Sequence, residues 1–291
     1  MVPPGRYRRT PHVLRPGDVR HAYIDGDSLA YLMAGSDSCP KAVSREMMIA
    51  RVRHIERITH APATVLVTGR GSEKGKRFFI ATVKPYQGHR AGSHKPNNWE
   101  FLRNILEGDN PPFQVIRTYE AEADDLFGQF AHEAGGNVAI HYDDKDMRMI
   151  PAVHLTWEHM DIVDMRDGED ALVWGKQYGL RWFWLQMLQG DSADNIPGLP
   201  WVVTGAKRAR CGEKTAEQLL AGVDPQNYGG VVLHFYRALY GADAELHFLE
   251  QAMLLWMRKQ PANPFCVVDN GPLRGLITAD ERAAMEDRLC A

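Results

Sequence analysis

Residues 190–198 (GDSADNIPG) constrain the fold of this chain more than any other stretch of its sequence. Two acidic residues, Asp191 and Asp194, lie three positions apart at the point where an apolar segment rich in Trp and Leu ends. Because Gly190 and Gly198 flank these residues, the sequence predicts that the preceding helix stops and the chain turns sharply. A capped turn is the simplest interpretation, but such a turn also presents two carboxylates to a cation.

The segment that follows this turn has the features of an anion-binding helix start. Gly212, Lys214 and Thr215 begin a new helix, and the first amides of a helix are unpaired donors that suit a phosphate. Each half of the region, taken alone, is common in proteins. The two halves together indicate a protein that holds a phosphodiester near metal ions.

The motif GDSADNIPG…GEKTAEQLL resembles the signature of the 5′-nuclease superfamily, which includes flap endonucleases, the 5′-nuclease domain of DNA polymerase I and phage 5′→3′ exonucleases. The resemblance covers roughly residues 20–222 and is closest in layout to the phage 5′→3′ exonucleases. It implies a helix-turn-helix variant that grips duplex DNA, with the last acids of a two-metal site and a K⁺ ion at the duplex-binding turn. The family spaces its two glycine motifs closely, whereas this chain inserts residues 199–211, for which we expect an enlarged basic loop.

Length and composition are those of an ordinary globular protein with one large α/β domain, or such a domain with a helical satellite. The chain has 291 residues, and its net charge of −3 excludes a uniformly basic nucleic-acid-binding surface, although local patches still decide binding. Four scattered cysteines without CxxC spacing favour free thiols in a reducing cytoplasm. No segment predicts a membrane span or a signal peptide, so we expect a cytoplasmic protein, in the host cytoplasm if phage-encoded.

Alternating apolar patterns predict an α/β fold with a central, mostly parallel twisted sheet flanked by helices, similar to the PIN-like core of the 5′-nucleases. We expect strands at 21–24, 64–67, 113–118, 137–142, 153–157 and 161–163, and helices at 41–60, 97–106, 176–189, 231–240, 244–258 and 280–289. The predicted regions are a flexible basic arm (1–20), a nuclease core (21–190) containing a basic gateway segment (70–96), a helix-hairpin-helix-like duplex-binding motif (191–222) and a helical C-terminal region (223–291).

Acidic residues follow three of the predicted strands. Asp25 ends the first strand, and Asp27 or Ser28 suits the N-cap of the next helix. The segments 122–125 (EADD) and 143–146 (DDKD) match the acidic motifs of the family, although alone they are typical of a helix start and a turn. The candidate metal ligands are Asp25, Glu122, Asp124, Asp125, Asp144, Asp146, Asp191 and Asp194.

These acids arrive from four separate segments and repel one another unless cations neutralise them. All are hard oxygen ligands, which select Mg²⁺ or Mn²⁺, and two such ions can activate a water and stabilise a departing oxygen. We expect two Mg²⁺ ions, replaceable by Mn²⁺. Asp25, Glu122, Asp124 and Asp144 are expected to hold the inner ions, and Asp146, Asp191 and Asp194 the second ion. Thr68-Gly69 stands where most relatives carry another Asp, and Thr68, Glu73 or a water could compensate.

The gateway segment is basic and carries aromatic residues, which favours a segment that tracks the nucleic-acid backbone and stacks on bases. Residues 84–90 (KPYQGHR) resemble the family pattern Tyr-Lys-x-x-Arg, with Gln87 in place of the lysine. Lys84 is the candidate for the missing ammonium, and with Arg90 and Asp25 it forms the predicted catalytic set. The predicted DNA contacts are Lys76, Arg77, Tyr86, Arg90 and Lys95, together with Gly198, Lys207, Arg208, Gly212, Lys214 and Thr215.

The resemblance implies a divalent-metal-dependent 5′→3′ exonuclease, with flap endonuclease activity as a further expectation. Its partners would be duplex, nicked or flapped DNA and RNA primers hybridised to DNA during phage replication, and we expect a monomer. One alternative is a PIN-type endoribonuclease, which shares the acidic sheet edge but lacks the duplex-binding motif. The other is a non-catalytic DNA-structure-binding protein with a degenerate site.

Overall fold

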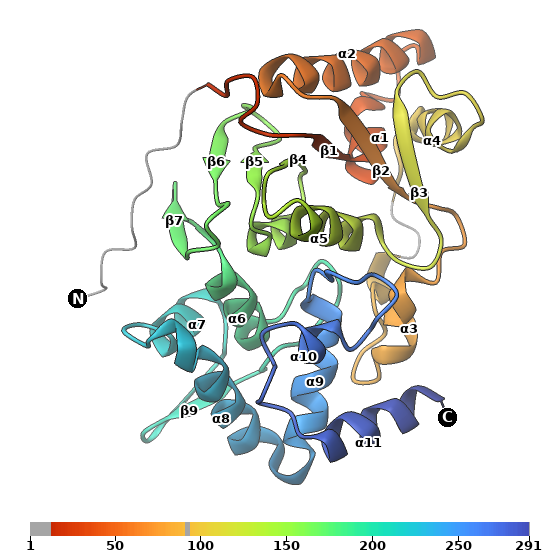
Figure 1. Ribbon diagram of the computed structural model, residues 1–291. Coiled ribbons are helices and arrows are strands. Elements are labelled where there is room, and N and C mark those ends of the chain that lie inside the picture. The colour runs from red at the N-terminus through yellow and green to blue at the C-terminus, as the bar shows by residue number, and fades with distance from the viewer. Residues whose placement is uncertain (1–12, 91–93, 291) are drawn as a thin grey trace.

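The computed structural model describes residues 13–90 and 94–290 (Figure 1). At its centre is a six-stranded sheet with the order β3-β2-β1-β4-β5-β6, in which all neighbours run parallel except β6, which is antiparallel to β5. The strands are β1 (Ala22–Asp25), β2 (Ala63–Thr68), β3 (Gln114–Thr118), β4 (Ala139–His141), β5 (Val153–Leu155) and β6 (Ile162–Asp164). The predicted α/β fold with a central, mostly parallel sheet is confirmed.

Helices cover both faces of the sheet because its central strands are apolar on both sides. In β2, Val65 and Val67 belong to the core that α1, α2 and α4 close, whereas Leu66 belongs to the core on the opposite face with α5. This alternation follows from the two-residue period of a strand. The helices on the sheet are α1 (Gly26–Met33), α2 (Lys41–Thr59), α4 (Trp99–Glu107) and α5 (Ala123–Glu133).

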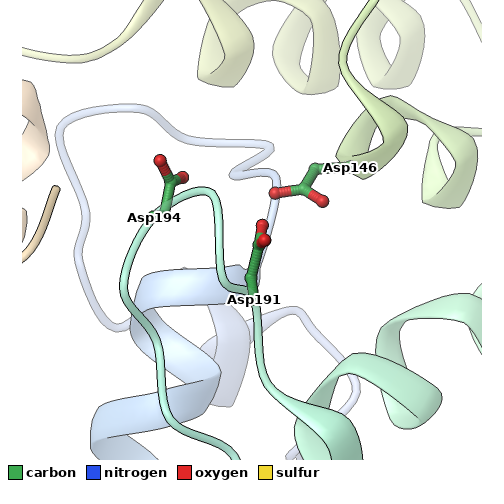
Figure 2. Close-up of side chains that lie close together, drawn as sticks. All are labelled: Asp146, Asp191 and Asp194. Atoms are coloured by element: carbon green, nitrogen blue, oxygen red, sulfur yellow. The ribbon is translucent and has the colours of Figure 1, made fainter. Parts of the chain in front are cut away.

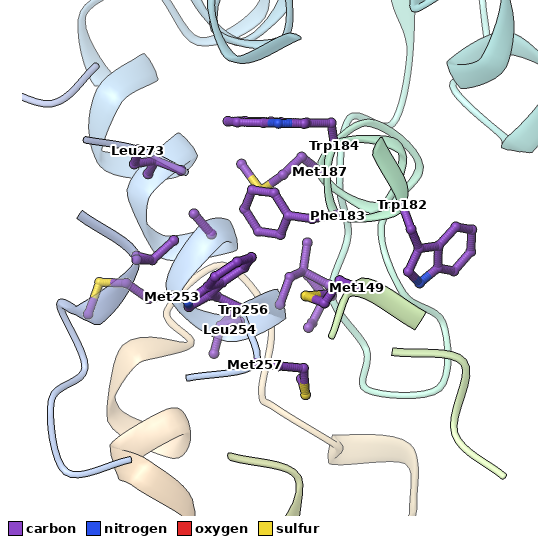
Figure 3. Close-up of a cluster of buried hydrophobic side chains, with 14 of the residues drawn as sticks. Met149, Trp182, Phe183, Trp184, Met187, Met253, Leu254, Trp256, Met257 and Leu273 are labelled. Atoms are coloured by element: carbon purple, nitrogen blue, oxygen red, sulfur yellow. The ribbon is translucent and has the colours of Figure 1, made fainter. Parts of the chain in front are cut away.

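The second half of the chain is mainly helical and packs around α6, as Figure 3 shows for Phe183, Trp184 and Met187 facing Met253 and Trp256. The ring centroids of Phe183 and Trp256 lie 5.3 Å apart, and both side chains are buried. The helices are α6 (Leu180–Gln189), α7 (Glu213–Leu219), α8 (Tyr228–Tyr240), α9 (Ala244–Leu255), α10 (Cys266–Asp269) and α11 (Ala279–Cys290). Within the described part of the chain, each helix is too short or too polar to pass through a lipid bilayer.

The predicted helix 176–189 is wrong at its start. Residues Lys176–Tyr178 form strand β8, which pairs with β7 (Ala171–Val173), and α6 begins only at Leu180. Gly179 separates the two elements with a φ of 89°, and a Cβ at this position would lie 2.6 Å from the Asp170 carboxylate. The backbone therefore breaks at this glycine, which the apolar pattern did not reveal.

The predicted basic arm is also shorter than expected. Leu14 and Val19 are buried in the core, and the amide of Arg20 donates to the carbonyl of Asn137 at 3.0 Å. Residues 13–20 are therefore part of the folded core, because two apolar side chains anchor them against the sheet. Residues 1–12 lie outside the described part of the chain.

The insertion at 199–211 forms a β-hairpin in place of the expected loop. Strand β9 (Val202–Thr204) pairs antiparallel with β10 (Lys207–Ala209), and Gly205 with a φ of 60° lies in the two-residue turn between them. The charge of the segment is as expected, because Lys207 and Arg208 are exposed. In Figure 1 this hairpin projects from the helical half, away from the six-stranded sheet.

Buried histidines make the fold sensitive to acid. His154 in β5 is 1% exposed; its Nε2 donates to the carbonyl of Ile150 at 2.9 Å, and its Nδ1 accepts from the Tyr142 hydroxyl at 2.6 Å. Burial lowers the pKa of His154 to about 4. Because the unfolded chain takes up a proton below a pKa of about 6.5 and the folded chain does not, the histidine's contribution to stability is lost as the pH falls from 6.5 towards 4.

The free energy of unfolding should fall between pH 7 and pH 5 in both proteins. We expect this fall to be smaller in the His154→Asn variant than in the wild type, by about 1–2 kcal/mol. Urea unfolding at both pH values measures this difference in slope, and the titration of the remaining groups cancels because it is common to both proteins. The exposed His132→Asn variant is the control and should keep the wild-type slope. Equal slopes for wild type and His154→Asn would contradict the interpretation.

Candidate active site

The acidic motifs meet at the carboxyl end of the parallel sheet because each one ends a strand or begins the element after it. Asp25 is the last residue of β1 and the N-cap of α1, where its carboxylate accepts from the amides of Asp27 and Ser28. The predicted cap at Asp27 or Ser28 is therefore wrong by a few residues. Glu122 occupies the N-cap position of α5. Asp144 follows β4, and its side chain accepts from the amide of Asp146 at 2.9 Å.

A cavity of about 570 Å³ opens at this edge of the sheet. Acids from all four predicted segments line it, which supports the proposed clustering. The lining acids are Asp25, Asp27, Glu122, Asp124, Asp143, Asp144 and Asp194. The basic residues in its wall are Arg70, Lys74, Lys95 and Arg103. Among these described lining residues there is no His or Cys, so the available ligands are oxygen atoms.

Three of the predicted metal ligands form a compact buried triad. One carboxylate oxygen from each of Asp146, Asp191 and Asp194 lies within 4.8 Å of the other two, and Figure 2 shows the three side chains close together on two separate segments. Asp194 also lines the cavity, so the triad adjoins it. Lys145 reaches the same carboxylates, with its Nζ 2.6 Å from Asp191 and 3.4 Å from Asp146.

Two glycines form the turn that carries this triad. Gly190 ends α6 with a φ of 75°, and a Cβ there would lie 2.4 Å from the Ile196 carbonyl. Gly198 has a φ of 58°, and a Cβ there would lie 2.2 Å from the amide nitrogen of Gly190. Asp191 and Ile196 exchange two backbone hydrogen bonds across the turn, at 2.8 and 2.7 Å. The turn therefore has room for neither side chain, and it fixes the two aspartates relative to α6.

The cost of bringing these acids together appears in their pKa values. Burial, and then the charge of Asp27, raises the pKa of Asp25 to about 7. Burial and the charges of Asp25 and Asp144 raise the pKa of Asp124 well above its usual range. Burial also raises the pKa of Asp146, with Asp144 and Asp191 adding to the effect. Such repulsion between hard oxygen ligands is relieved by divalent cations, so the residues present fit Mg²⁺ or Mn²⁺.

Asp125 does not belong with the other predicted ligands. Its side chain is fully buried, and its two oxygens accept from the Arg77 guanidinium at 2.7 and 2.9 Å and from the amide of Arg258 at 3.1 Å. It does not line the cavity. Burial would raise the pKa of Asp125, but the Arg77 guanidinium outweighs burial and lowers it. The prediction of Asp125 as a metal ligand is wrong because both oxygens are already occupied.

Three predicted DNA contacts are likewise buried. Arg77 is 0% exposed and pairs with Asp125 and with Glu122, at 2.7 and 3.2 Å. The Tyr86 hydroxyl is directed inward and donates to Glu122 at 2.9 Å or to Asp194 at 3.1 Å. The Gly198 amide donates to Gln251. These residues support the site from the protein interior and cannot reach a nucleic acid. The prediction of DNA contacts is therefore corrected for Arg77, Tyr86 and Gly198.

A lysine other than the predicted Lys84 lines the cavity. Lys84 is exposed and does not line the cavity, whereas Lys74 does. Lys74 Nζ donates to Gln87 Oε1 at 2.5 Å and lies 3.6 Å from Glu122. The side chain of Arg90 lies outside the described part of the chain. Lys76 and Lys95 are exposed, and Lys95 Nζ lies 3.7 Å from the centroid of the Trp99 ring.

The position of the absent family Asp is occupied by a different arrangement. Thr68 lines the cavity and its hydroxyl accepts from the Ala123 amide, while Glu73 is exposed and does not line it. Asp27 lines the cavity beside Thr68 and pairs with Arg103, which also donates to the Thr68 carbonyl. Thr68 therefore remains a candidate to compensate for the absent ligand, and Glu73 does not.

The remaining predicted DNA contacts lie on the helical half. Lys207 and Arg208 are exposed on β10, and the Arg208 guanidinium stacks 3.8 Å from the centroid of Trp201. Gly212 is the N-cap residue of α7, and Lys214 is exposed in its first turn. The Thr215 hydroxyl donates to the Arg210 carbonyl at 3.0 Å.

The residues that line or contact the site without having been predicted from the sequence include Asp27, Lys74, Arg103 and Lys145. Lys145 could have been found, because it lies inside the DKD element that supplied two predicted ligands. Asp27 also lies in a motif after a predicted strand, but the same pattern is typical of a helix cap. Arg103 is in an ordinary amphipathic helix and Lys74 in a run of basic residues, so only the tertiary structure distinguishes them from their neighbours.

Comparisons with known proteins agree with this architecture. No family model matches the chain. It is 30% identical to DNA polymerase I of Bacillus subtilis over 226 residues, which cover 69% of this chain and 23% of that protein. It is 34% identical to DNA polymerase I of Rhizobium leguminosarum over 127 residues, 41% of this chain and 11% of that protein. The chain thus spans about a quarter or less of the length of these relatives.

Solved structures share the fold over nearly the whole chain. A T5 protein co-crystallised with metal ions superposes with a TM-score of 0.58 and 14% identity, covering 93% of this chain and 98% of that chain. A bacteriophage T5 flap endonuclease in a complex with DNA and metal ions gives a TM-score of 0.56 and 16% identity, covering 94% and 100%. The chain therefore shares the fold of these T5 structures, and 69% of it is similar in sequence to part of DNA polymerase I, in agreement with the resemblance to the 5′-nuclease superfamily.

Proposed function

We propose that this protein is a divalent-metal-dependent nuclease that hydrolyses phosphodiester bonds from the 5′ ends of duplex, nicked or flapped DNA. The observation that carries the proposal is the convergence of acids from four separate segments on one cavity, with basic residues in the same wall. Retaining so many mutually repelling carboxylates is costly unless cations use them. This argues against a purely structural DNA-binding protein.

In this proposal Asp25, Glu122, Asp124 and Asp144 hold one part of the metal site, and Asp146, Asp191 and Asp194 hold the other. When bound, such ions supply a water activated for attack and stabilisation of the charge that develops on the phosphate. The attacking water forms the new P–O bond while the bond to the 3′ oxygen breaks. The products are a 5′-phosphate and a 3′-hydroxyl, with the proton lost by the water balanced by the proton gained by the leaving oxygen.

The surrounding side chains hold the carboxylates in position. Tyr86 holds Glu122 and Asp194 through its hydroxyl, and the Gln186 amide donates to Asp146. Lys145 neutralises part of the charge of the triad: burial opposes its protonation, but Asp146 and Asp191 outweigh burial and raise its pKa. These contacts limit the motion of the ligands, which is the usual requirement for a preorganised metal site.

The proposed DNA path runs between two basic regions. The gateway supplies Lys76, Lys95 and Arg90, and the duplex side supplies Lys207, Arg208, the α7 start at Gly212, Lys214 and Thr215. The known complex of the T5 flap endonuclease with DNA supports DNA as the partner. We further propose that RNA primers hybridised to DNA are substrates, that K⁺ binds at the duplex-binding turn, and that the protein acts as a monomer in the cytoplasm during phage replication.

The test is cleavage of duplex, nicked and 5′-flapped oligonucleotides that carry a label at either the 5′ or the 3′ end, in Mg²⁺. We expect short labelled products from the 5′-labelled strand first, and none in EDTA. Replacing the DNA with single-stranded RNA of the same sequence examines the PIN-type endoribonuclease alternative. Internal cleavage of that RNA without attack on the DNA substrates would overturn the proposal, as would tight DNA binding without cleavage in any divalent ion.

A further inference from the structure

Residues 74–76 form a left-handed turn directly before α3 (Arg77–Ile80). Lys74, Gly75 and Lys76 have φ values of 49°, 62° and 62°. This conformation is unfavourable for a residue other than Gly and persists only where the surrounding structure imposes it. Two lysines in such a turn, of which Lys74 lines the acidic cavity, therefore need a structural explanation.

The neighbouring elements hold the turn from several sides. The Gly75 amide donates to the Glu120 carbonyl at 2.8 Å, and the Lys74 amide donates to the Ser72 hydroxyl at 3.1 Å. Below the turn lies Arg258 from the C-terminal region, which is 1% exposed. A Cβ on Gly75 would lie 2.3 Å from Arg258 Nη1, and the φ of 62° disfavours other residues, so a side chain here would force the guanidinium or the turn to shift. The C-terminal region thus fixes a segment of the gateway.

The turn directs Lys74 into the cavity. Lys74 Nζ lies 2.5 Å from Gln87 Oε1 and 3.6 Å from Glu122 Oε1, and its side chain is 26% exposed. The other end of the Gln87 amide donates to Asp194 Oδ1 at 2.9 Å. Gln87 therefore ties the ammonium to a carboxylate of the buried triad and fixes its place between the two groups of predicted metal ligands.

The other described cations that line the cavity have partners that are not predicted metal ligands. Arg103 pairs with Asp27 and Glu107, and Arg70 pairs with Glu100 on the rim. Lys95 is exposed and stacks on Trp99. Of these four cations, Lys74 is the one that pairs with a predicted metal ligand.

We propose that Lys74 is a catalytic residue whose ammonium contacts the scissile phosphate, and that Gln87 and the left-handed turn braced by Arg258 position it. The proposal rests on the nuclease function proposed above. An ammonium beside the phosphate stabilises the charge that develops on its non-bridging oxygens in the transition state. Because this interaction is strongest in the transition state, its loss should lower the rate of cleavage more than the affinity for DNA.

The first test compares Lys74→Ala with Lys74→Arg in single-turnover cleavage of a 5′-flapped duplex in Mg²⁺. We expect Lys74→Ala to lower the rate constant about 100-fold and Lys74→Arg to retain a larger part of it, because a cation remains. The Kd for the same DNA, measured in Ca²⁺, should change less than about fivefold. Mn²⁺ affinity from calorimetry should not fall, since removal of an ammonium beside Glu122 removes a competing charge.

A charge exchange gives a sharper test of position. The Lys74→Gln single variant should be as slow as Lys74→Ala. Adding Gln87→Lys to this variant places an ammonium next to the position that Lys74 Nζ occupies in the wild type. The double variant should therefore cleave at least tenfold faster than Lys74→Gln. A purely structural role for Lys74 predicts no recovery.

The turn itself is tested with two glycine substitutions that share a positive φ. Gly75→Ala should slow cleavage at unchanged Mn²⁺ affinity, because its Cβ would collide with Arg258 and displace Lys74. Gly241→Ala is the matched control, with a φ of 57° and no atom within 4 Å of the added Cβ, and should cleave at the wild-type rate. Thermal unfolding of both variants checks that they remain folded.

The outcomes separate this inference from the function on which it rests. An inactive wild-type protein overturns the proposed function, whatever the variants do. An active wild type with a Lys74→Ala variant of unchanged rate overturns the inference alone. A larger loss of cleavage rate in Lys84→Ala than in Lys74→Ala would assign the catalytic ammonium to Lys84. That result would also overturn the inference.

Discussion

Replacing Asp191 with Asn is expected to lower the rate of DNA cleavage on the order of 1000-fold or more, because it removes one carboxylate from the buried triad with Asp146 and Asp194. The substitution keeps the shape of the side chain, and the remaining oxygen can still accept from the Ala193 amide, as Asp191 does at 2.8 Å. The turn should therefore survive while the charge is lost. Single-turnover cleavage in Mg²⁺ and Mn²⁺ calorimetry measure the two effects, and both should fall together.

The matched control for this prediction is Asp109→Asn. Asp109 is exposed at the surface, so the same chemical change there should leave cleavage and Mn²⁺ affinity at the wild-type level. Circular dichroism of Asp191→Asn should match the wild type. A folded Asp191→Asn variant that retains a tenth or more of the wild-type rate would remove the triad from the mechanism.

Replacing Arg77 with Met is expected to destabilise the fold by about 3–5 kcal/mol, because it leaves Asp125 as an unpaired buried charge. Arg77 is 0% exposed, makes the two-pronged pair with Asp125, and also donates to the backbone carbonyls of Leu254 and Trp256. It therefore joins the gateway, α5 and the C-terminal region. Urea unfolding at pH 7 measures the loss.

A double replacement distinguishes the unpaired charge from lost packing. The Arg77→Met, Asp125→Leu variant removes both charges and should recover much of the stability, whereas Arg53→Met on the exposed face of α2 should change it by less than about 0.5 kcal/mol. Arg77 lowers the pKa of Asp125, so the pair contributes stability above the unfolded-state pKa of about 3.9, and this is lost as the pH falls through the folded-state value. Equal stability of the single variant and the wild type would contradict the argument.

Much of the fold was predictable from the sequence because the sheet is built from short apolar segments separated by clear breaks. The strand at 64–67 is apolar throughout and became the buried β2, one position longer at each end. The prediction failed where a single glycine outweighs the apolar pattern, as at Gly179, and where a basic segment pairs with itself, as in the hairpin of Val202–Ala209. In both cases the local backbone geometry decides, and composition carries little information about it.

The candidate site also has a part that the sequence predicted and a part that it did not. Asp25, Glu122, Asp124, Asp144 and Asp194 line one cavity, as the positions of their motifs after strands and turns predicted. Asp125 has the same residue type and the same motif, yet it pairs with Arg77 and does not line the cavity. A motif gives the order of acids along the chain, whereas the rotation of the helix decides which of them face the cavity.

The sequence by itself determined the class of fold and the meeting of the acidic segments, because the carboxyl ends of parallel strands must share one edge of the sheet. Only the tertiary structure decided which charges are available there. Arg77 is withdrawn into the core by partners more than 40 residues away, and Lys74 is turned into the cavity by contacts with Glu120 and Arg258. Such long-range pairing depends on packing between distant segments, which no local pattern in the sequence encodes.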